Sequence, residues 1–394
     1  MNNKEVKFLK SNRHLKEGNH IFIDVIKRRY NPFFKIKLDL VNSNTDYVFD
    51  LDLSSATLNK ILNVEYSNKR RFRFLYYKSV FTEIKQKLQS LLSELNDKQV
   101  FVYLTDEGVW SEMLMSILKN IDTVNVKTVM VQHGLHFIEE PPSNLKLRKF
   151  INKLTELIFG YPSYGYGYIG SNLDYYLVYS TSDRDYVKAK NSQSLAFSCP
   201  KLIKYDFIQK YKVETKLVAA DTGQESEKVL FAMEPLIPTS GVNCAEIEMY
   251  EKMSSLFIEI SSITKSRILF RPHPAMNTSK TKRLISKLSY KDIIVFDCES
   301  SLNRVLSTVD FVLSIHSTVL FDAMLVGKVP IQIITPCDDR KLHTKLEMLN
   351  INNLKRTKIS EVFSKKMISK YMKNIALSDD DVVWPIYTGE KNNE

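Results

Sequence analysis

Short apolar runs that alternate with segments of helical periodicity constrain this chain more than any other feature. Runs of this length, bounded by polar turns, are typical of buried strands, and their alternation with helices predicts parallel α/β units. In the first half we expect strands at 20–25, 100–104, 128–132 and 175–179. In the second half we expect them at 229–233, 268–271, 293–296, 311–314 and 330–334. Helical spacing predicts helices at 79–95, 109–119, 145–159, 245–263, 279–288, 300–307, 317–326 and 340–348.

The length and one polar segment predict two domains. A chain of 394 residues is long enough to bury two cores. The best candidate for a linker is the polar segment 209–228, which contains Asp221-Thr-Gly-Gln-Glu-Ser-Glu. We therefore predict an N-terminal domain at 1–208, a linker at 209–228 and a second domain at 229–375. The tail at 376–394 is expected to cross back onto the first domain.

Composition narrows the class of protein. Hydrophobic residues make up 44% of the chain and charged residues 26%, which is usual for globular proteins. No apolar stretch approaches the ~20 residues of a membrane span, and the start is polar, so we expect neither a spanning helix nor a secretory signal. The four cysteines are scattered, which fits a reducing cytoplasm. The net charge of +11 suits an anionic membrane or an anionic substrate, and without a nucleic-acid-binding motif we expect no nucleic acid partner.

Two groups of polar residues follow expected strands of the first half. Asp106-Glu107-Gly108 lies between the strand at 100–104 and the helix at 109–119. Ligands of open α/β sheets bind outside the carboxyl ends of strands, where a carboxylate can accept a proton from a substrate hydroxyl. The alternative is that Thr105 or Asp106 caps the following helix. His133-Gly134 follows the strand at 128–132, and we expect it to face the same cleft as Asp106.

Three further groups follow strands of the second half. His273-Pro274 follows the strand at 268–271, where the flanking prolines fix the imidazole. Glu299 and Ser300 follow the strand at 293–296, and a carboxylate at that position can hold ribose hydroxyls. His316, Ser317 and Thr318 lie between a strand and a helix, where hydroxyls and backbone N–H groups can bind an anion. Helix capping is the alternative for Ser317 and for the segment around Glu299.

Metal and nucleoside triphosphate chemistry are not indicated. Asp50 and Asp52 match the Asp-x-Asp pattern of metal-bound nucleotide sugars, but they lie in an alternating segment at 47–53 that we interpret as a strand. The histidines at 133, 273 and 316 are not at metal-ligand spacing. No glycine-rich phosphate loop ending in Lys-Ser/Thr is present, so ATP or GTP hydrolysis is not expected.

A basic, amphipathic helix at 145–159 precedes a segment at 159–170 that is rich in tyrosine and glycine. Such a segment forms neither a good helix nor a good strand. It is either a surface loop or a platform for a sugar acceptor or a membrane interface, since tyrosine combines an apolar ring with a polar end. We expect the helix and the segment to contact an anionic membrane from the cytoplasmic side.

Taken together, Asp106-Glu107-Gly108, His273-Pro274 and Ser317-Thr318 resemble the motifs of bacterial sialyltransferases with the GT-B fold. The resemblance implies an α/β fold of two Rossmann-like domains that face each other across a cleft, with the acceptor on 1–208 and the nucleotide sugar on 229–375. It implies that Asp106 is the general base on the acceptor hydroxyl. His273, Ser317 and Thr318 would bind the phosphate of a CMP-activated donor, and Glu299 falls where the family's ribose-binding carboxylate stands.

The reaction implied by this resemblance is a single inverting displacement at the anomeric carbon of the donor. The partners would be a CMP-activated sugar and a glycan of capsule or lipooligosaccharide, without a metal or other cofactor. Gln132-His133-Gly134 departs from the family and looks more like capsule-polysaccharide enzymes. The alternatives are therefore a Kdo transferase, a CDP-glycerol-type polyol-phosphate transferase, and a non-enzymatic binder of anionic polymer.

Overall fold

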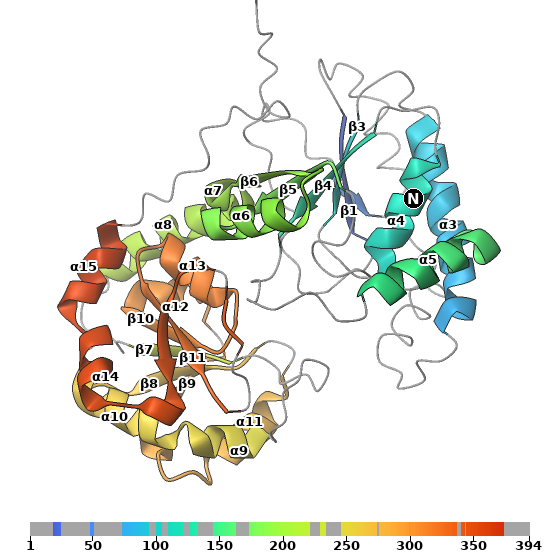
Figure 1. Ribbon diagram of the computed structural model, residues 1–394. Coiled ribbons are helices and arrows are strands. Elements are labelled where there is room, and N and C mark those ends of the chain that lie inside the picture. The colour runs from blue at the N-terminus through green and yellow to red at the C-terminus, as the bar shows by residue number, and fades with distance from the viewer. Residues whose placement is uncertain are drawn as a thin grey trace, which may run out of the picture. The chain divides into compact units, whose positions relative to one another are not determined.

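The computed structural model contains two separate parallel sheets (Figure 1). The structure describes residues 19–24, 48–50, 73–93, 100–104, 109–120, 126–132, 145–162, 173–220, 229–233, 246–273, 276–298, 300–336, 340–342 and 344–373. These residues divide into two units, one that runs to Ser198 and one that begins at Cys199. Each unit contains one sheet with its own helices and its own core, as the sequence pattern predicts.

The sheet of the first unit has the strand order β2-β1-β3-β4-β5-β6. All neighbouring strands pair in parallel. The strands are β1 (Asn19–Asp24), β2 (Val48–Asp50), β3 (Val100–Leu104), β4 (Val126–Val131), β5 (Tyr175–Val178) and β6 (Leu195–Ser198). The order reverses between β1 and β3, which is the switch point where doubly wound sheets bind ligands.

The described helices of the first unit differ in how they are buried. They are α3 (Arg73–Ser93), α4 (Val109–Lys119), α5 (Leu145–Phe159) and α6 (Thr181–Lys190). On α3, the fully buried side chains Ile84, Leu88 and Leu92 recur every four residues, which places them on one helix face. Helix α5 differs from this pattern, because its large apolar side chains are exposed.

The sheet of the second unit has the order β12-β11-β10-β7-β8-β9, and its strands are all parallel. The strands are β7 (Val229–Ala232), β8 (Ile268–Arg271), β9 (Ile294–Phe296), β10 (Phe311–Ser314), β11 (Val329–Ile334) and β12 (Glu347–Asn350). This is the strand order of the Rossmann dinucleotide-binding fold, in which the first and fourth strands are neighbours at the switch point. Here those two strands are β7 and β10.

The core of the second unit is built on aromatic contacts across the sheet face. The rings of Phe231 and Phe257 lie 5.1 Å apart, and those of Phe231 and Phe270 lie 5.4 Å apart. The buried Tyr290 hydroxyl donates to the carbonyl of Tyr250 at 2.9 Å. Helices of this unit are α7 (Pro200–Ile203), α8 (Tyr205–Ala220), α9 (Glu246–Lys252), α10 (Ser254–Thr264), α11 (Thr278–Ile285), α12 (Leu302–Thr308), α13 (Val319–Leu325), α14 (Arg356–Val362) and α15 (Lys365–Lys373).

The predicted boundary at 208 and the linker at 209–228 are wrong for the residues that the structure describes. Residues 209–220 belong to α8, which packs against α12 of the second unit. The half-buried residues Ile208, Tyr211 and Thr215 recur at helical spacing on the packed side, and exposed lysines on the other side make the segment look like a linker. The second unit therefore begins at Cys199, before α7. The residues at 221–228 and 374–394, and with them the crossing tail, lie outside the described part of the chain.

The predicted helix at 340–348 is also wrong, and its residues are extended where they are described. The buried side chain of Gln332 on β11 donates from Nε2 to the carbonyl of Arg340 at 2.9 Å. Its Oε1 accepts from the amide of Leu342 at 3.3 Å. These contacts hold the segment beside β11, and the chain then continues into β12 at the edge of the sheet. The predicted helix at 245–263 is divided at Met253 into α9 and α10.

Candidate functional site

A buried serine hydroxyl links the two strands at the switch point of the second sheet. Ser314, the last residue of β10, is fully buried, and its Oγ donates to the carbonyl of Ala232 at the end of β7 at 2.7 Å. The same Oγ accepts from the amide of Ser317 at 3.3 Å. One side chain thus joins the two strands at their carboxyl ends and fixes the start of the turn that follows β10.

The turn after β10 carries His316, Ser317 and Thr318 into the first turn of α13. Ser317 is buried, and its Oγ accepts from the amide of Val319, the first residue of α13, at 3.3 Å. The N-cap position of α13 itself is Thr318. A serine hydroxyl that accepts one hydrogen bond can still donate its own proton. The side chain of Thr318 is half-buried and makes no capping hydrogen bond to the helix. His316 is half-buried between Ile315 and Ser317, which are buried.

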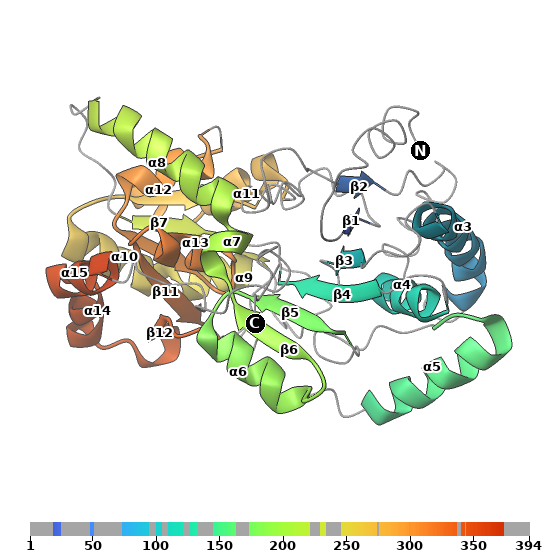
Figure 2. The same ribbon diagram turned by 90° about the horizontal axis from the view of Figure 1, so that it is seen from above.

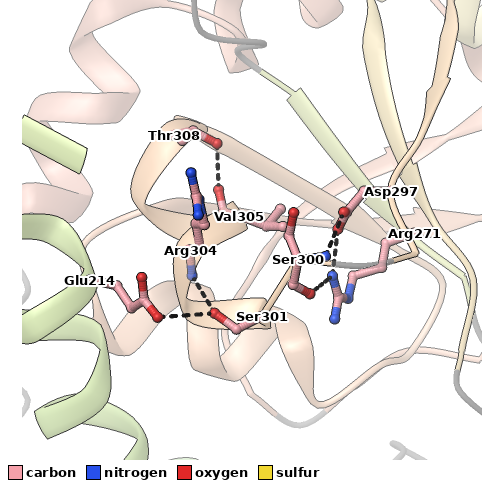
Figure 3. A network of polar contacts seen from close by, with 8 residues as sticks. All are labelled: Glu214, Arg271, Asp297, Ser300, Ser301, Arg304, Val305 and Thr308. Atoms are coloured by element: carbon pink, nitrogen blue, oxygen red, sulfur yellow. Dashed lines mark hydrogen bonds and ion pairs between the residues drawn. The ribbon is translucent and has the colours of Figure 1, made fainter. Parts of the chain in front are cut away.

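An ion pair connects the ends of β8 and β9 (Figure 3). Nη1 of Arg271 contacts Oδ2 of Asp297 and also donates to the carbonyl of Ser300 at 2.9 Å. Oδ1 of Asp297 accepts from the amide of Ser300 at 3.1 Å. These charge-assisted contacts fix the turns that follow both strands. The backbone of Ser300 serves this network, and a role for its side chain in binding stays a prediction.

Helix α12 begins immediately after this network. Oγ of Ser301 accepts from the amide of Arg304 at 3.1 Å and lies 3.4 Å from Oε1 of Glu214 on α8 (Figure 3). The helix cap in the segment 297–301 is therefore Ser301. Glu299 lies outside the described residues, so its role as a ribose ligand stays a prediction.

His273 lies after β8 at the same sheet edge as the turn after β10. Its residue is exposed, and its carbonyl accepts from the amide of Met276 at 2.8 Å across a short turn. β7 is the strand between β8 and β10, so the axes of these two strands are about 10 Å apart. The prediction that His273 and Ser317 follow strands of one sheet is confirmed. Pro274 lies outside the described residues.

The corresponding edge of the first sheet leads to residues that the structure does not describe. β3 ends at Leu104 beside β1, at the switch point, and Asp106-Glu107-Gly108 follows in the sequence. His133 and Gly134 follow β4 in the same way. These five residues lie outside the described part of the chain, as does Asp52. Asp50 is described, and it ends β2 as the strand interpretation predicts.

Gln132, the first residue of the Gln-His-Gly sequence, has a structural role. It is fully buried, and its Oε1 accepts from the amide of Tyr179 at 2.7 Å. Its own amide donates to the carbonyl of Leu177 at 2.9 Å. Gln132 therefore joins the ends of β4 and β5, much as Ser314 joins β7 and β10.

The sequence reasoning missed three polar residues that shape the second site. They are Ser314, Arg271 and Asp297. Ser314 is a lone hydroxyl at the end of a buried apolar run, and Arg271 and Asp297 carry opposite charges at the ends of two strands. The sequence shows that each of them is polar, but the strand order is needed to identify the residue that it contacts. Among the described residues, no group of three His, Cys, Asp or Glu side chains could hold a metal ion.

Comparison with family models and with curated proteins gave no match. Solved structures do resemble the chain. A structure described as the glycotransferase of kitacinnamycin has a TM-score of 0.50 and 7% identity, over 91% of this chain and 94% of that one. UDP-GlcNAc 2-epimerase from Neisseria meningitidis, bound to UDP-GlcNAc, has a TM-score of 0.46 and 11% identity, over 91% and 94% of the two chains. The apo structure of OtsA has a TM-score of 0.49 and 10% identity, over 91% and 95%.

The strand orders of the two sheets and the first of these likenesses define the fold. Each unit is a doubly wound parallel sheet, and the chain matches a glycosyltransferase structure over nearly its full length. The chain has the GT-B fold, with two Rossmann-like units, as the sequence predicts. A fold shared at this identity does not by itself define a donor or an acceptor.

Proposed function

We propose that this protein is an inverting glycosyltransferase that moves sialic acid, or a related nonulosonic acid, from a CMP-activated donor to a hydroxyl of a surface glycan. The observation that carries the proposal is the position of His273 and of Ser317-Thr318. These residues follow two strands that flank β7 at one edge of a Rossmann-type sheet. In such sheets, the crevice at this edge binds nucleotides.

The second unit would hold the donor phosphate with neutral and cationic hydrogen-bond donors. The Ser317 hydroxyl keeps a proton to donate while it accepts from Val319, and the Thr318 side chain is not used in capping. A protonated His273 would add a charge-assisted bond to the phosphate as CMP leaves. Fixed donors of this kind stabilise a leaving anion without reorganisation during the reaction. The contacts of Ser314 and Arg271 support the rigidity that this role needs.

The first unit would supply the general base. Asp106 follows β3 at the switch point of its own sheet, and a carboxylate there can take the proton of the attacking hydroxyl. The acceptor oxygen then forms a bond to the anomeric carbon while the bond to the CMP phosphate oxygen breaks. The proton ends on Asp106, and the electron pair of the broken bond ends on the phosphate. The surface glycan would be part of capsule or lipooligosaccharide.

Transfer from a panel of donors tests this function. The protein is incubated with a glycan acceptor and, in separate reactions, with CMP-sialic acid, CMP-Kdo, CDP-glycerol and UDP-GlcNAc, each in EDTA and in magnesium. We expect release of CMP from CMP-sialic acid, equal in the two conditions. Preferred turnover of CMP-Kdo or CDP-glycerol would favour the capsule-enzyme alternatives that the Gln132-His133-Gly134 sequence suggests. Preferred turnover of UDP-GlcNAc would contradict the CMP dependence, and no turnover of any donor would favour a non-enzymatic binder.

Removing both hydroxyls at the start of α13 is expected to weaken CMP binding. Ser317→Ala with Thr318→Ala should cost about 1.5–3 kcal/mol for each charge-assisted hydrogen bond that is lost. Calorimetric titration with CMP measures this cost. The matched control is Ser307→Ala with Thr308→Ala, because those hydroxyls donate only to carbonyls of α12. If the Ser317/Thr318 variant binds CMP as tightly as wild type, the two hydroxyls do not bind the nucleotide and serve only the start of α13.

A further inference from the structure

Helix α5 presents its apolar side chains to the outside of the first unit. The buried side of the helix is centred on Asn152, which is fully buried and polar. The large apolar side chains are 45% to 84% exposed at five positions, namely Leu147, Phe150, Leu154, Leu157 and Ile158. Surface helices of globular proteins normally bury the apolar stripe and expose the polar one. In α5 this arrangement is inverted, although the helix is well formed.

The exposed positions form one continuous stripe. Spacings of three and four residues from Leu147 to Ile158 keep them within an arc of about 100° around the helix, directly opposite Asn152. In Figure 2, α5 lies to the side of the sheet of its own unit. The helix is anchored at its end, where Gly160 adopts a φ of 79° and the buried ring of Tyr161 lies 5.2 Å from that of Phe81. The stripe is thus held outward by a fixed connection to the core.

Lysines flank the stripe along one side. Lys146, Lys149 and Lys153 are exposed and follow the same helical spacing as their apolar neighbours. The only acidic residue in α5 is Glu156. A surface that is apolar in its centre and positive along its flank is complementary to an anionic lipid interface, where acyl chains lie below negative headgroups. A second copy of the stripe would bring another set of lysines to this flank without matching carboxylates.

We propose that α5 docks the protein flat on an anionic lipid surface. Leu147, Phe150, Leu154, Leu157 and Ile158 enter the boundary between headgroups and acyl chains, and the three lysines contact the headgroups. Docking of this kind does not require a spanning helix, and none of the described helices is long and apolar enough to be one. The proposal is independent of the donor, because it rests on one helix of the first unit. Residues 163–170 of the tyrosine-rich segment lie outside the described part of the chain.

Vesicle flotation of the full chain tests the docking. Wild type is expected to float with vesicles of phosphatidylcholine and phosphatidylglycerol and to float far less with phosphatidylcholine alone. Lys146→Gln, Lys149→Gln and Lys153→Gln together should weaken binding about 100-fold, because each lysine near an anionic surface contributes about fivefold. Phe150→Ser with Leu157→Ser should weaken binding to anionic vesicles by at least about tenfold through loss of buried apolar area. These side chains are exposed, so thermal unfolding should be unchanged.

Two control variants test whether vesicle binding depends on α5 or only on the total positive charge and the exposed apolar area of the protein. Lys355→Gln, Lys365→Gln and Lys366→Gln remove three exposed lysines of the second unit. Leu195→Ser with Ile258→Ser removes two exposed apolar side chains that belong to β6 and α10. Both variants should float like wild type. Equal loss in the control variants, equal binding to neutral vesicles, or no binding by wild type would overturn the proposal. A further result would also overturn it: a wild type that does not bind vesicles and sediments as a dimer, while the Phe150→Ser, Leu157→Ser variant sediments as a monomer.

Discussion

Replacing Asp106 with asparagine is expected to lower the transfer rate by about 10²–10⁴ while CMP affinity stays within about twofold of wild type. Asparagine keeps the size and the hydrogen-bonding oxygen but cannot take a proton from the acceptor hydroxyl. The nucleotide would be held by the second unit, so donor binding should not change. Initial rates with the preferred donor, and calorimetry with CMP, measure the two quantities separately.

The outcome for Asp106 also decides between catalysis and helix capping. If Asp106 only caps the helix, its substitution should lower the free energy of unfolding by about 1 kcal/mol without a selective loss of turnover. Asp185→Asn is a suitable control, because Asp185 is an exposed acid on α6 of the same unit. A turnover near wild type in Asp106→Asn, together with a lower unfolding temperature, would contradict the general-base assignment.

A buried ion pair gives the second large effect. Nζ of Lys204, between α7 and α8, lies 2.8 Å from Oδ1 of Asp322 on α13, and both side chains are less than 8% exposed. Replacing one partner leaves the other charge buried, which typically costs about 3–5 kcal/mol. We therefore expect Lys204→Met to lower the free energy of unfolding by this amount in urea titration. Because Asp322 lies in the helix that begins after Thr318, CMP affinity should fall as well.

A double-mutant cycle isolates the coupling in this pair. Lys204→Met with Asp322→Leu removes both charges, and its stability should recover most of the loss, since a buried pair can be replaced by apolar groups at little cost. The control pair is Lys252 and Glu248, 2.7 Å apart on exposed parts of α9. Its Lys252→Met variant should change stability by about 0.5 kcal/mol or less. Additive losses in the cycle would show that Lys204 and Asp322 do not depend on each other.

The central strands of both sheets could be predicted from the sequence. Runs at 100–104, 268–271 and 311–314 coincide with β3, β8 and β10. β10 is buried along its whole length, and strands buried on both faces read as nearly continuous apolar runs. The edge strands β6 and β12 were missed. Their residues alternate between buried and exposed, and Leu195 on β6 is an exposed leucine, so no apolar run marks them. Helix α8 was mistaken for a linker for the same reason, since only one of its faces is packed.

The candidate site could be predicted only as positions along the chain. His273 and Ser317 follow apolar runs, and the parallel sheet brings those ends to one edge, as expected. The residues that hold the edge together act through partners far away in the sequence. Ser314 bonds across 82 positions to Ala232, and Arg271 bonds across 29 positions to Ser300. Such pairs depend on which strands are neighbours, and the strand order follows from packing of the whole unit.

Hydrogen–deuterium exchange with and without CMP tests most directly that the nucleotide binds at the switch point of the second sheet. At saturating CMP, we expect slower exchange in peptides that cover residues 314–321 and 271–273. Peptides that cover β4 and β5 of the first unit should be unchanged. The Ser317→Ala, Thr318→Ala variant should lose the protection at the same CMP concentration. Protection confined to the first unit, or protection at 314–321 that persists in that variant, would show that CMP does not bind at this switch point.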